Sequence, residues 1–217
     1  SELLDGLVLE TDDSDAVLSE SVSNKFLLAK SFFDLKEYAR AAHCLKDFAA
    51  KGRSKEAFLR RYSLYLAGEK EKEEHLSAVE RGLSVKIPNQ QLKVIHQEYQ
   101  DLYARQDMDP FDLYLYGVVL VQIEAHDTAR KVLIESVNQF PFNWSAWLEL
   151  ANLSESKPRQ YEEQLNDHFM KEFFLAHLAL EFQNNDIALK LYNNLKQSFP
   201  NSLFISEKMA VASYNVR

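Results

Sequence analysis

Glycine and proline are scarce in this chain, which contains 5 of each among 217 residues. Because these residue types form most tight turns, so low a content excludes a sandwich or barrel of many short strands. Cys44 is the single cysteine, which excludes an intrachain disulfide framework and a zinc site made of several thiolates. The longest apolar run, from Leu113 to Val121, is too short to cross a bilayer. No basic segment ending in small residues opens the sequence, so no secretion signal is predicted.

Basic residues are absent from the start of the chain. Residues 1–22 contain seven acidic residues and no lysine or arginine, so the other 195 residues carry 26 acids (33 minus 7) against 25 bases. Without a basic stripe to neutralise phosphates, no nucleic-acid partner is predicted. The acidic leader is interpreted either as a solvated end or as a short amphipathic helix. Its apolar residues would be Leu3, Leu4, Leu7 and Val8.

With 46% apolar and 27% charged residues, the composition is that of a globular, mostly helical protein of a reducing compartment. An internal repeat is present within it. Small residues, a large residue and a proline recur at spacings of 12, 4 and 8, first as Gly117, Ala129, Leu133 and Pro141, and again as Ala176, Ala188, Tyr192 and Pro200. Small residues at this spacing let two antiparallel helices approach closely, and the proline ends the second helix. Such pairs must stack to bury their apolar faces.

The repeat extends along the chain with a period of 34 residues. We predict that small or large residues at equivalent positions pack helix against helix throughout. These packing residues are Ala29, Ala41, Ser63, Gly117, Ala129, Pro141, Trp147, Ala151, Ala176, Ala188, Pro200 and Ala210. The period and pattern resemble the tetratricopeptide repeat family. The predicted fold is therefore an all-α tetratricopeptide-repeat solenoid of stacked antiparallel helix pairs.

The period is broken at two places. We predict an array over residues 23–217 with an irregular insertion at about 69–110, where the charge run Glu69–His75 is expected to be a solvated helix end or loop. A second irregularity is a shortened helix around Pro158. Because the last predicted helix has no partner before Arg217, the array is expected to continue beyond it.

Five blocks of sequence are more specific than the repeat itself. They are Lys25–Leu45, Tyr62–Lys72, Leu113–Leu120, Trp144–Leu153 and Met170–His177. These blocks resemble the cell division cycle protein 23 family of anaphase-promoting complex (cyclosome) subunits, whereas the leader and residues 76–110 do not. The resemblance implies a non-catalytic scaffold subunit of a ubiquitin ligase in mitosis, present in nucleus and cytoplasm. It also implies a homodimer formed by N-terminal repeats, contacts with other subunits of the complex, and coactivator-binding residues beyond Arg217.

First helices of tetratricopeptide repeats line a concave groove. Here the groove positions are mostly apolar, and the candidate interaction residues are Phe26, Lys30, Phe33, Leu64, Phe111, Tyr114, Val118, Val121, Leu148, Met170 and Phe173, followed by Leu180. One hypothesis is that the groove receives a helix of a partner, most economically a second copy of the chain. The alternative is that these residues belong to the core of the array itself.

Two other binding roles, and catalysis, are alternatives to this hypothesis. A chaperone adaptor would need a cationic clamp for a carboxylate, but only Lys30 and Arg60 lie near suitable positions. A half-tetratricopeptide RNA-processing scaffold is suggested by Trp144 and Trp147. Cys44 follows His43 directly, and adjacent helical residues point apart, so no catalytic pair is predicted. The sequence predicts no enzyme, metal site, cofactor, small-molecule substrate or membrane partner.

Overall fold

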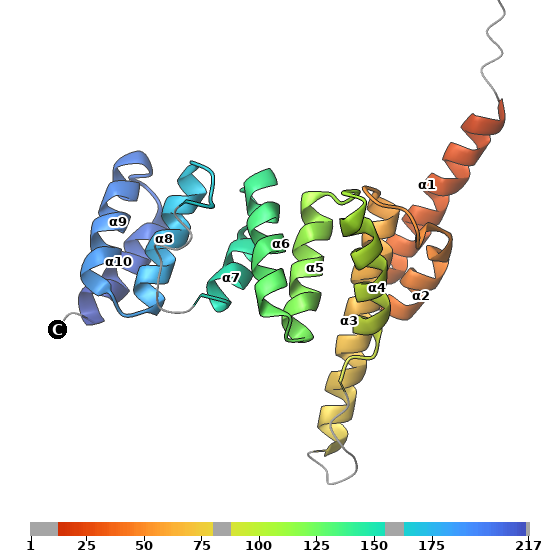
Figure 1. Ribbon diagram of the computed structural model, residues 1–217, viewed down its shortest axis with the longest axis horizontal. Coiled ribbons are helices and arrows are strands. Elements are labelled where there is room, and N and C mark those ends of the chain that lie inside the picture. Colours follow the sequence, from red (N-terminus) through yellow and green to blue (C-terminus); the bar gives the residue numbers. More distant parts are fainter. Residues whose placement is uncertain (1–12, 80–87, 155–162, 216–217) are drawn as a thin grey trace, which may run out of the picture. The chain divides into compact units, whose positions relative to one another are not determined.

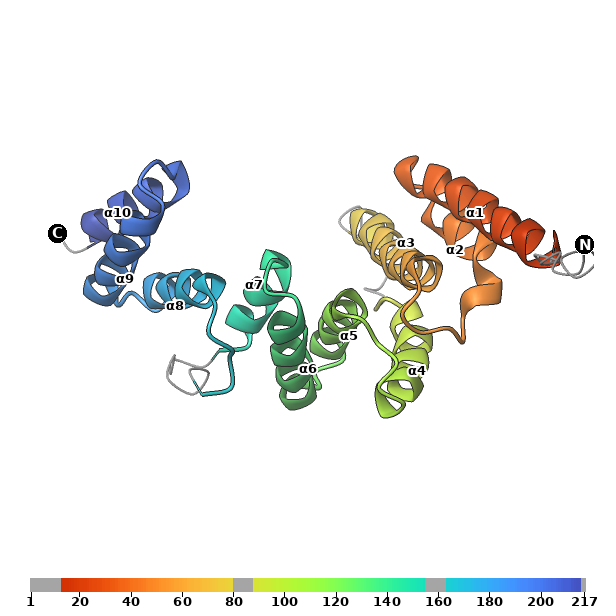
Figure 2. The ribbon, with the colours of Figure 1, turned by 90° about the horizontal axis from the view of Figure 1, so that it is seen from above.

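A computed structural model (Figure 1) describes residues 13–79, 88–154 and 163–215 of the chain. Within these ranges the regular secondary structure is entirely helical. The helices are α1 (Asp13–Asp34), α2 (Tyr38–Cys44), the 3-10 helix η1 (Lys46–Phe48), α3 (Lys55–Val79), α4 (Gln91–Ala104), α5 (Pro110–Gln122), α6 (His126–Gln139), α7 (Trp144–Asn152), α8 (Phe169–Glu181), α9 (Asn185–Ser198) and α10 (Leu203–Asn215). Within each part of the chain, α1 to α4 and α5 to α10, helices that follow one another pack together, as Figure 2 shows for α5 and α6 and for α8 and α9. The predicted all-α array of helix pairs is confirmed.

The chain forms two compact units, Ser1–Asp107 and Met108–Arg217. In the first unit α1, α2 and α3 enclose a small core built around Ala29, Leu45, Phe48 and Ala57, which are at most 5% exposed. Small side chains at Ala29 and Ala57 let these helices lie close to one another. Ala29 was predicted from the repeat pattern, whereas Ala57 was not.

Helices α3 and α4 occupy much of the stretch predicted to be an irregular insertion. The charge run Glu69–His75 lies in the second half of α3, so it is helix rather than loop. Helix α4 buries a stripe at helical spacing: Leu92, Ile95, Tyr99 and Leu102. This stretch is largely helical, and α4 carries an amphipathic pattern without the small-residue motif of the repeat.

Asn89 fastens the start of α4 to α3. Its Nδ2 donates to the carbonyl oxygen of Tyr65 (3.2 Å) and to Oε1 of Glu69 (3.0 Å), while its Oδ1 accepts from the amide of Gln91 (2.9 Å). A Cβ atom at Gly68 would come within 1.8 Å of Asn89 Oδ1. Gly68 is therefore required by close approach at this position.

In the second unit, α5 and α6 form a closely packed pair. A Cβ atom at Gly117 of α5 would meet Leu133 Cδ2 of α6 at 2.5 Å. Trp147 of α7 is 1% exposed, and its ring nitrogen donates to the carbonyl oxygen of Pro141 (2.8 Å). A further core links α8, α9 and α10 around Ala176, Ala188, Tyr192, Leu195 and Ile205. Close backbone approach and large side chains thus alternate along this unit.

Four helix ends turn through residues other than glycine. Lys36, Gln106, Glu124 and Gln183 have φ angles of 60°, 56°, 64° and 58°. Each lies two residues beyond the last residue of its helix, at the left-handed position of a Schellman turn, which normally favours glycine. At α5, for example, the amides of Glu124 and Ala125 donate to Val121 (3.0 Å) and Leu120 (2.9 Å). The scarcity of glycine thus extends to positions where the backbone would favour it.

Two predictions fall partly or wholly outside the described residues. The apolar leader residues Leu3, Leu4, Leu7 and Val8 lie there, as does the shortened helix around Pro158. Helix α1 begins at Asp13, so the end of the predicted leader is helical. Among the helices that the structure describes, none is long and apolar enough to cross a membrane.

Candidate protein-interaction surface

Most residues predicted to pack helix against helix are inaccessible to solvent. Those that are at most 1% exposed are Ala29, Ala41, Ser63, Ala129, Trp147, Ala176 and Ala188, and Gly117 is also buried. The prolines differ, since Pro141 is half-buried and Pro200 is exposed. Both follow the end of a second helix, where they limit its length rather than fill a core.

Ala151 and Ala210 do not occupy buried positions. Ala151 is half-buried, and Ala210 is exposed, whereas Ala212 of the same helix is 0% exposed. In α5 and α8 the equivalent small residue faces the next helix, but α10 packs against the preceding helix α9. Because no helix follows α10 within the described residues, the packing role of Ala210 stays a prediction.

The predicted groove residues divide into three groups by exposure. Phe111 (44%), Leu148 (36%) and Lys30 are exposed, whereas Val118 is buried at 9%. The remaining members are half-buried: Phe26, Phe33, Leu64, Tyr114, Val121, Met170, Phe173 and Leu180. This set is neither a closed core nor an open apolar surface.

Intrachain contacts explain the partial burial. The ring of Phe33 lies 5.4 Å from that of Tyr38 and 5.7 Å from that of Tyr62, measured between centroids. The ammonium group of Lys55 lies 4.7 Å from the centroid of Phe26. Phe33 therefore contributes to packing inside the first unit as well as to its surface.

The cations considered for a carboxylate clamp are already engaged. Lys30 Nζ donates to Asp34 Oδ2 at 2.7 Å, and Arg60 Nη1 donates to both carboxylate oxygens of Glu98, at 2.9 and 2.7 Å. Glu98 also accepts from Arg61 Nε at 3.1 Å. Because these cations have carboxylate partners within the first unit, the structure gives no support to an adaptor for acidic tails.

Arg61 is the largest buried polar side chain of the first unit. It is 0% exposed, and its Nη2 donates to the carbonyl oxygens of Ala49 (3.0 Å) and Lys51 (2.6 Å). Together with the contact to Glu98, these bonds tie the loop after η1 to α3 and α4. Arg61 is therefore a structural residue, and its charge is compensated where it is buried.

An exposed leucine face on α1 was missed in the sequence. Leu27 and Leu28 of α1 are 57% and 52% exposed, and Leu35, which directly follows the last residue of α1, is 69% exposed, although α1 packs with its other side on α2. The prediction used only the repeat positions that face a concave groove, which here are Phe26, Lys30 and Phe33. The three exposed leucines are not at these positions. The adjacent pair Leu27 and Leu28, with Leu35 about two helical turns later, would have indicated a second apolar face.

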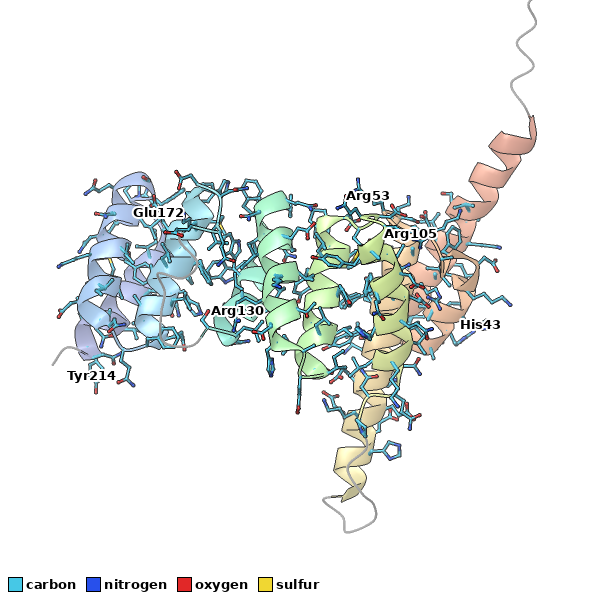
Figure 3. All side chains as sticks on the ribbon, viewed as in Figure 1. His43, Arg53, Arg105, Arg130, Glu172 and Tyr214 are labelled. Carbon is cyan, nitrogen blue, oxygen red and sulfur yellow. The ribbon has the colours of Figure 1, made fainter. Side chains whose placement is uncertain are left out.

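The side chains considered for catalysis do not form a reactive cluster. Cys44 packs at the edge of the first core, whereas the adjacent His43 is exposed and projects from α2 (Figure 3). In the ranges that the structure describes, no group of three or more His, Cys, Asp or Glu could hold a metal ion.

Burial perturbs the pKa of Glu149 and of His177 in the second unit, and it raises the pKa of Tyr192 to about 12. Desolvation raises the pKa of Glu149, although a hydrogen bond from Asn152 acts in the opposite direction. Desolvation also lowers the pKa of His177, against the attraction of Glu181. These carboxyl and imidazole groups lie on helices of the array and are perturbed by their packing.

Comparison with known proteins identifies the family. Residues 5–210 match the family model of Anaphase promoting complex subunit 8 / Cdc23. The chain belongs to this family. The match includes residues 76–110, where the sequence blocks had shown no resemblance, so α4 is part of the family pattern and not an unrelated insertion.

Relatives within the subunit 8 / Cdc23 family are similar over most of the chain. An Arabidopsis thaliana protein described as Anaphase-promoting complex subunit 8 is 42% identical over 193 residues, which are 88% of this chain and 33% of that protein. The Homo sapiens Cell division cycle protein 23 homolog is 40% identical over 197 residues, or 88% of this chain and 32% of the relative. A Dictyostelium discoideum subunit 8 is 35% identical over 239 residues, covering 89% and 40%. The chain thus spans about a third of the length of the first two.

Proposed function

We propose that this chain is part of a non-catalytic scaffold subunit of the anaphase-promoting complex. The observation that carries the proposal is the family match over residues 5–210, together with relatives named as subunits of that complex. Within each unit the stacked helix pairs offer extended surfaces of the kind that repeat proteins use to bind other proteins. The partners of the chain are accordingly other subunits of the complex.

Co-purification tests this role. The tagged chain, expressed in its source cells, is expected to bring down subunits of the ubiquitin ligase in stoichiometric amounts. Recovery of RNA-processing factors in their place, with no ubiquitin-ligase subunit, would contradict the proposal and favour the alternative suggested by Trp144 and Trp147.

Within that role, the first unit is proposed to form a homodimer. Its support is the exposed face of α1, where Leu27, Leu28 and Leu35 offer apolar area that no described segment covers. Burying a leucine contributes about 1.5–3 kcal/mol before the costs of association. A symmetric pair would use this face on both copies and would place it in the apolar groove of the other copy.

Leu28→Glu is expected to weaken the dimer at least tenfold, since a charged side chain would be buried in the interface. Sedimentation velocity over a micromolar concentration series measures the effect. Ile187→Glu is the matched control, because Ile187 of α9 is equally exposed, at 53% against 52% for Leu28. A strictly monomeric native chain, or equal weakening by both variants, would overturn the dimer without affecting the family role.

A further inference from the structure

Phenylalanine rings form a continuous ladder on the second unit, outside its main core. Phe142 lies 6.0 Å from Phe169 between ring centroids, Phe169 lies 5.6 Å from Phe199, and Phe173 links Phe199 (5.7 Å) to Phe204 (6.2 Å). We call the four exposed rings Phe142, Phe169, Phe199 and Phe204 the phenylalanine ladder; the half-buried ring of Phe173 joins the last two. Each of these four lies at or beside a helix end.

The ladder is open to solvent along its length. Its members are 59%, 40%, 37% and 40% exposed, in the order Phe142, Phe169, Phe199 and Phe204. A single exposed aromatic residue needs no explanation, but contiguous exposed rings mark an interaction surface. The rings stabilise one another through edge and tilted contacts, which presents their faces in a fixed arrangement.

Two ion pairs lie beside the ladder, and in each the carboxylate is more exposed than its lysine partner. The side chain of Lys171 is 14% exposed, and its Nζ donates to the carbonyl oxygen of Leu165 at 3.0 Å. Its ion-pair partner Asp167, at 3.6 Å, is fully exposed. Glu172 is also exposed and projects from α8 (Figure 3). A ligand approaching α8 therefore meets carboxylates beside aromatic faces.

The same pattern holds at α10. Lys208 lies over the ring of Phe204, 5.5 Å from its centroid, and is 28% exposed. Its neighbour Glu207 is 66% exposed. The N-terminal ends of α8 and α10, which carry partial positive charge, are capped by side chains of the chain itself. His168 Nδ1 accepts from the Met170 amide (3.2 Å), and Ser202 Oγ accepts from the Ile205 amide (3.4 Å). In both ion pairs the carboxylate is the more exposed charge, and Glu172 adds a third exposed carboxylate.

We propose that the phenylalanine ladder binds a basic peptide segment of another protein, in which arginine alternates with apolar residues. Guanidinium groups stack on the exposed rings and meet Asp167, Glu172 and Glu207 at their edges. The chain itself forms such a stack, with Arg40 lying 4.1 Å from the centroid of Phe32. This surface is distinct from the leucine face of α1 and serves a different partner.

A fluorescein-labelled octapeptide of alternating arginine and leucine is the probe, measured by fluorescence anisotropy with the full chain. Peptides with lysine or glutamate in place of arginine are the matched ligands. The arginine peptide is expected to bind most tightly, the lysine peptide several-fold more weakly, and the glutamate peptide not at all. Equal binding of the acidic and basic peptides would overturn the proposal.

Phe169→Ala is expected to weaken binding of the arginine peptide about tenfold. Phe142→Ala provides a second variant, because Phe142 lies in a loop and its truncation leaves the helices intact. Ile187→Ala is the control, as Ile187 is exposed at the opposite end of α9 from Phe199. Unchanged affinity in both phenylalanine variants, with native far-UV helicity, would exclude the ladder as the site.

Glu172→Lys tests the charge separately, with Asp186→Lys at the far end of α9 as its control. The first is expected to weaken the arginine peptide several-fold at low salt and the second to leave it unchanged. Equal effects of the two variants would show that the peptide responds only to the net charge of the chain, and would exclude the ladder as the binding site. Loss of self-association in Phe169→Ala would assign the ladder to a second copy instead.

Discussion

Glycine is absent from four helix ends where the backbone adopts the left-handed conformation, at Lys36, Gln106, Glu124 and Gln183. For residues with a Cβ atom this conformation costs about 1–2 kcal/mol. The hydrogen bonds of the Schellman turns offset that cost, as between the Gln183 amide and Leu180 (3.0 Å). Glycine substitutions at these four positions are therefore expected to stabilise the fold.

Glu124→Gly is expected to raise the free energy of unfolding by about 0.5–1 kcal/mol, the relief of strain less the added entropy of the unfolded chain. Glu124 is exposed, so its side chain contributes little packing. Urea denaturation measures the change, and Glu124→Ala is the control, since it removes the side chain and keeps the strain. Equal stabilisation by both variants would show that the side chain, rather than the backbone, is responsible.

At the scale of elements, one amide side chain holds the segment before α8. Asn138 of α6 donates through Nδ2 to the carbonyl oxygen of Gln164 (2.9 Å) and accepts through Oδ1 from the amide of Asn166 (2.9 Å). Leu165 between them is 5% exposed. We call these two hydrogen bonds the Asn138 bracket. The bracket joins α6 to the segment just before α8, which in sequence follows the shortened part of the repeat around Pro158.

Asn138→Ala is expected to lower the free energy of unfolding by about 1–2 kcal/mol, because it removes two hydrogen bonds to the backbone of the segment before α8. Asn138→Asp keeps the acceptor for Asn166 and loses the donor to Gln164, so about half the loss is expected. Gln139→Ala, on the exposed side of α6, is the neutral control. Thermal unfolding measures all three, and equal effects of Asn138→Ala and Gln139→Ala would contradict the bracket.

The sequence predicted elements where a motif recurs and missed them where it does not. Pairs such as Ala29 with Ala41 and Gly117 with Ala129 predicted helix contacts because close approach demands small residues. Helix α4 was not predicted, because its apolar residues recur at helical spacing without the small-residue motif. Exposure was harder still: Phe33 and Leu28 both lie on α1, but only tertiary contacts with Tyr38 and Tyr62 decide that Phe33 is covered.

At the scale of the whole molecule, the chain consists of two compact units, Ser1–Asp107 and Met108–Arg217, each with its own core. In a repeat array, stability comes from neighbouring helices rather than from distant ones. The packing within α5 to α10 links each helix to the next. We therefore predict that residues 108–217 fold without the first unit.

The isolated segment 108–217 is expected to retain its helical circular dichroism and to unfold in one cooperative transition. A segment starting at residue 126 is the control, because it lacks α5 and exposes side chains of α6 such as Leu133 and Val137, which are 0% and 1% exposed in the chain. Each loses about 1.5–3 kcal/mol of burial. The shorter segment should melt at a markedly lower temperature. A non-cooperative profile for 108–217 itself would show that its core depends on the first unit.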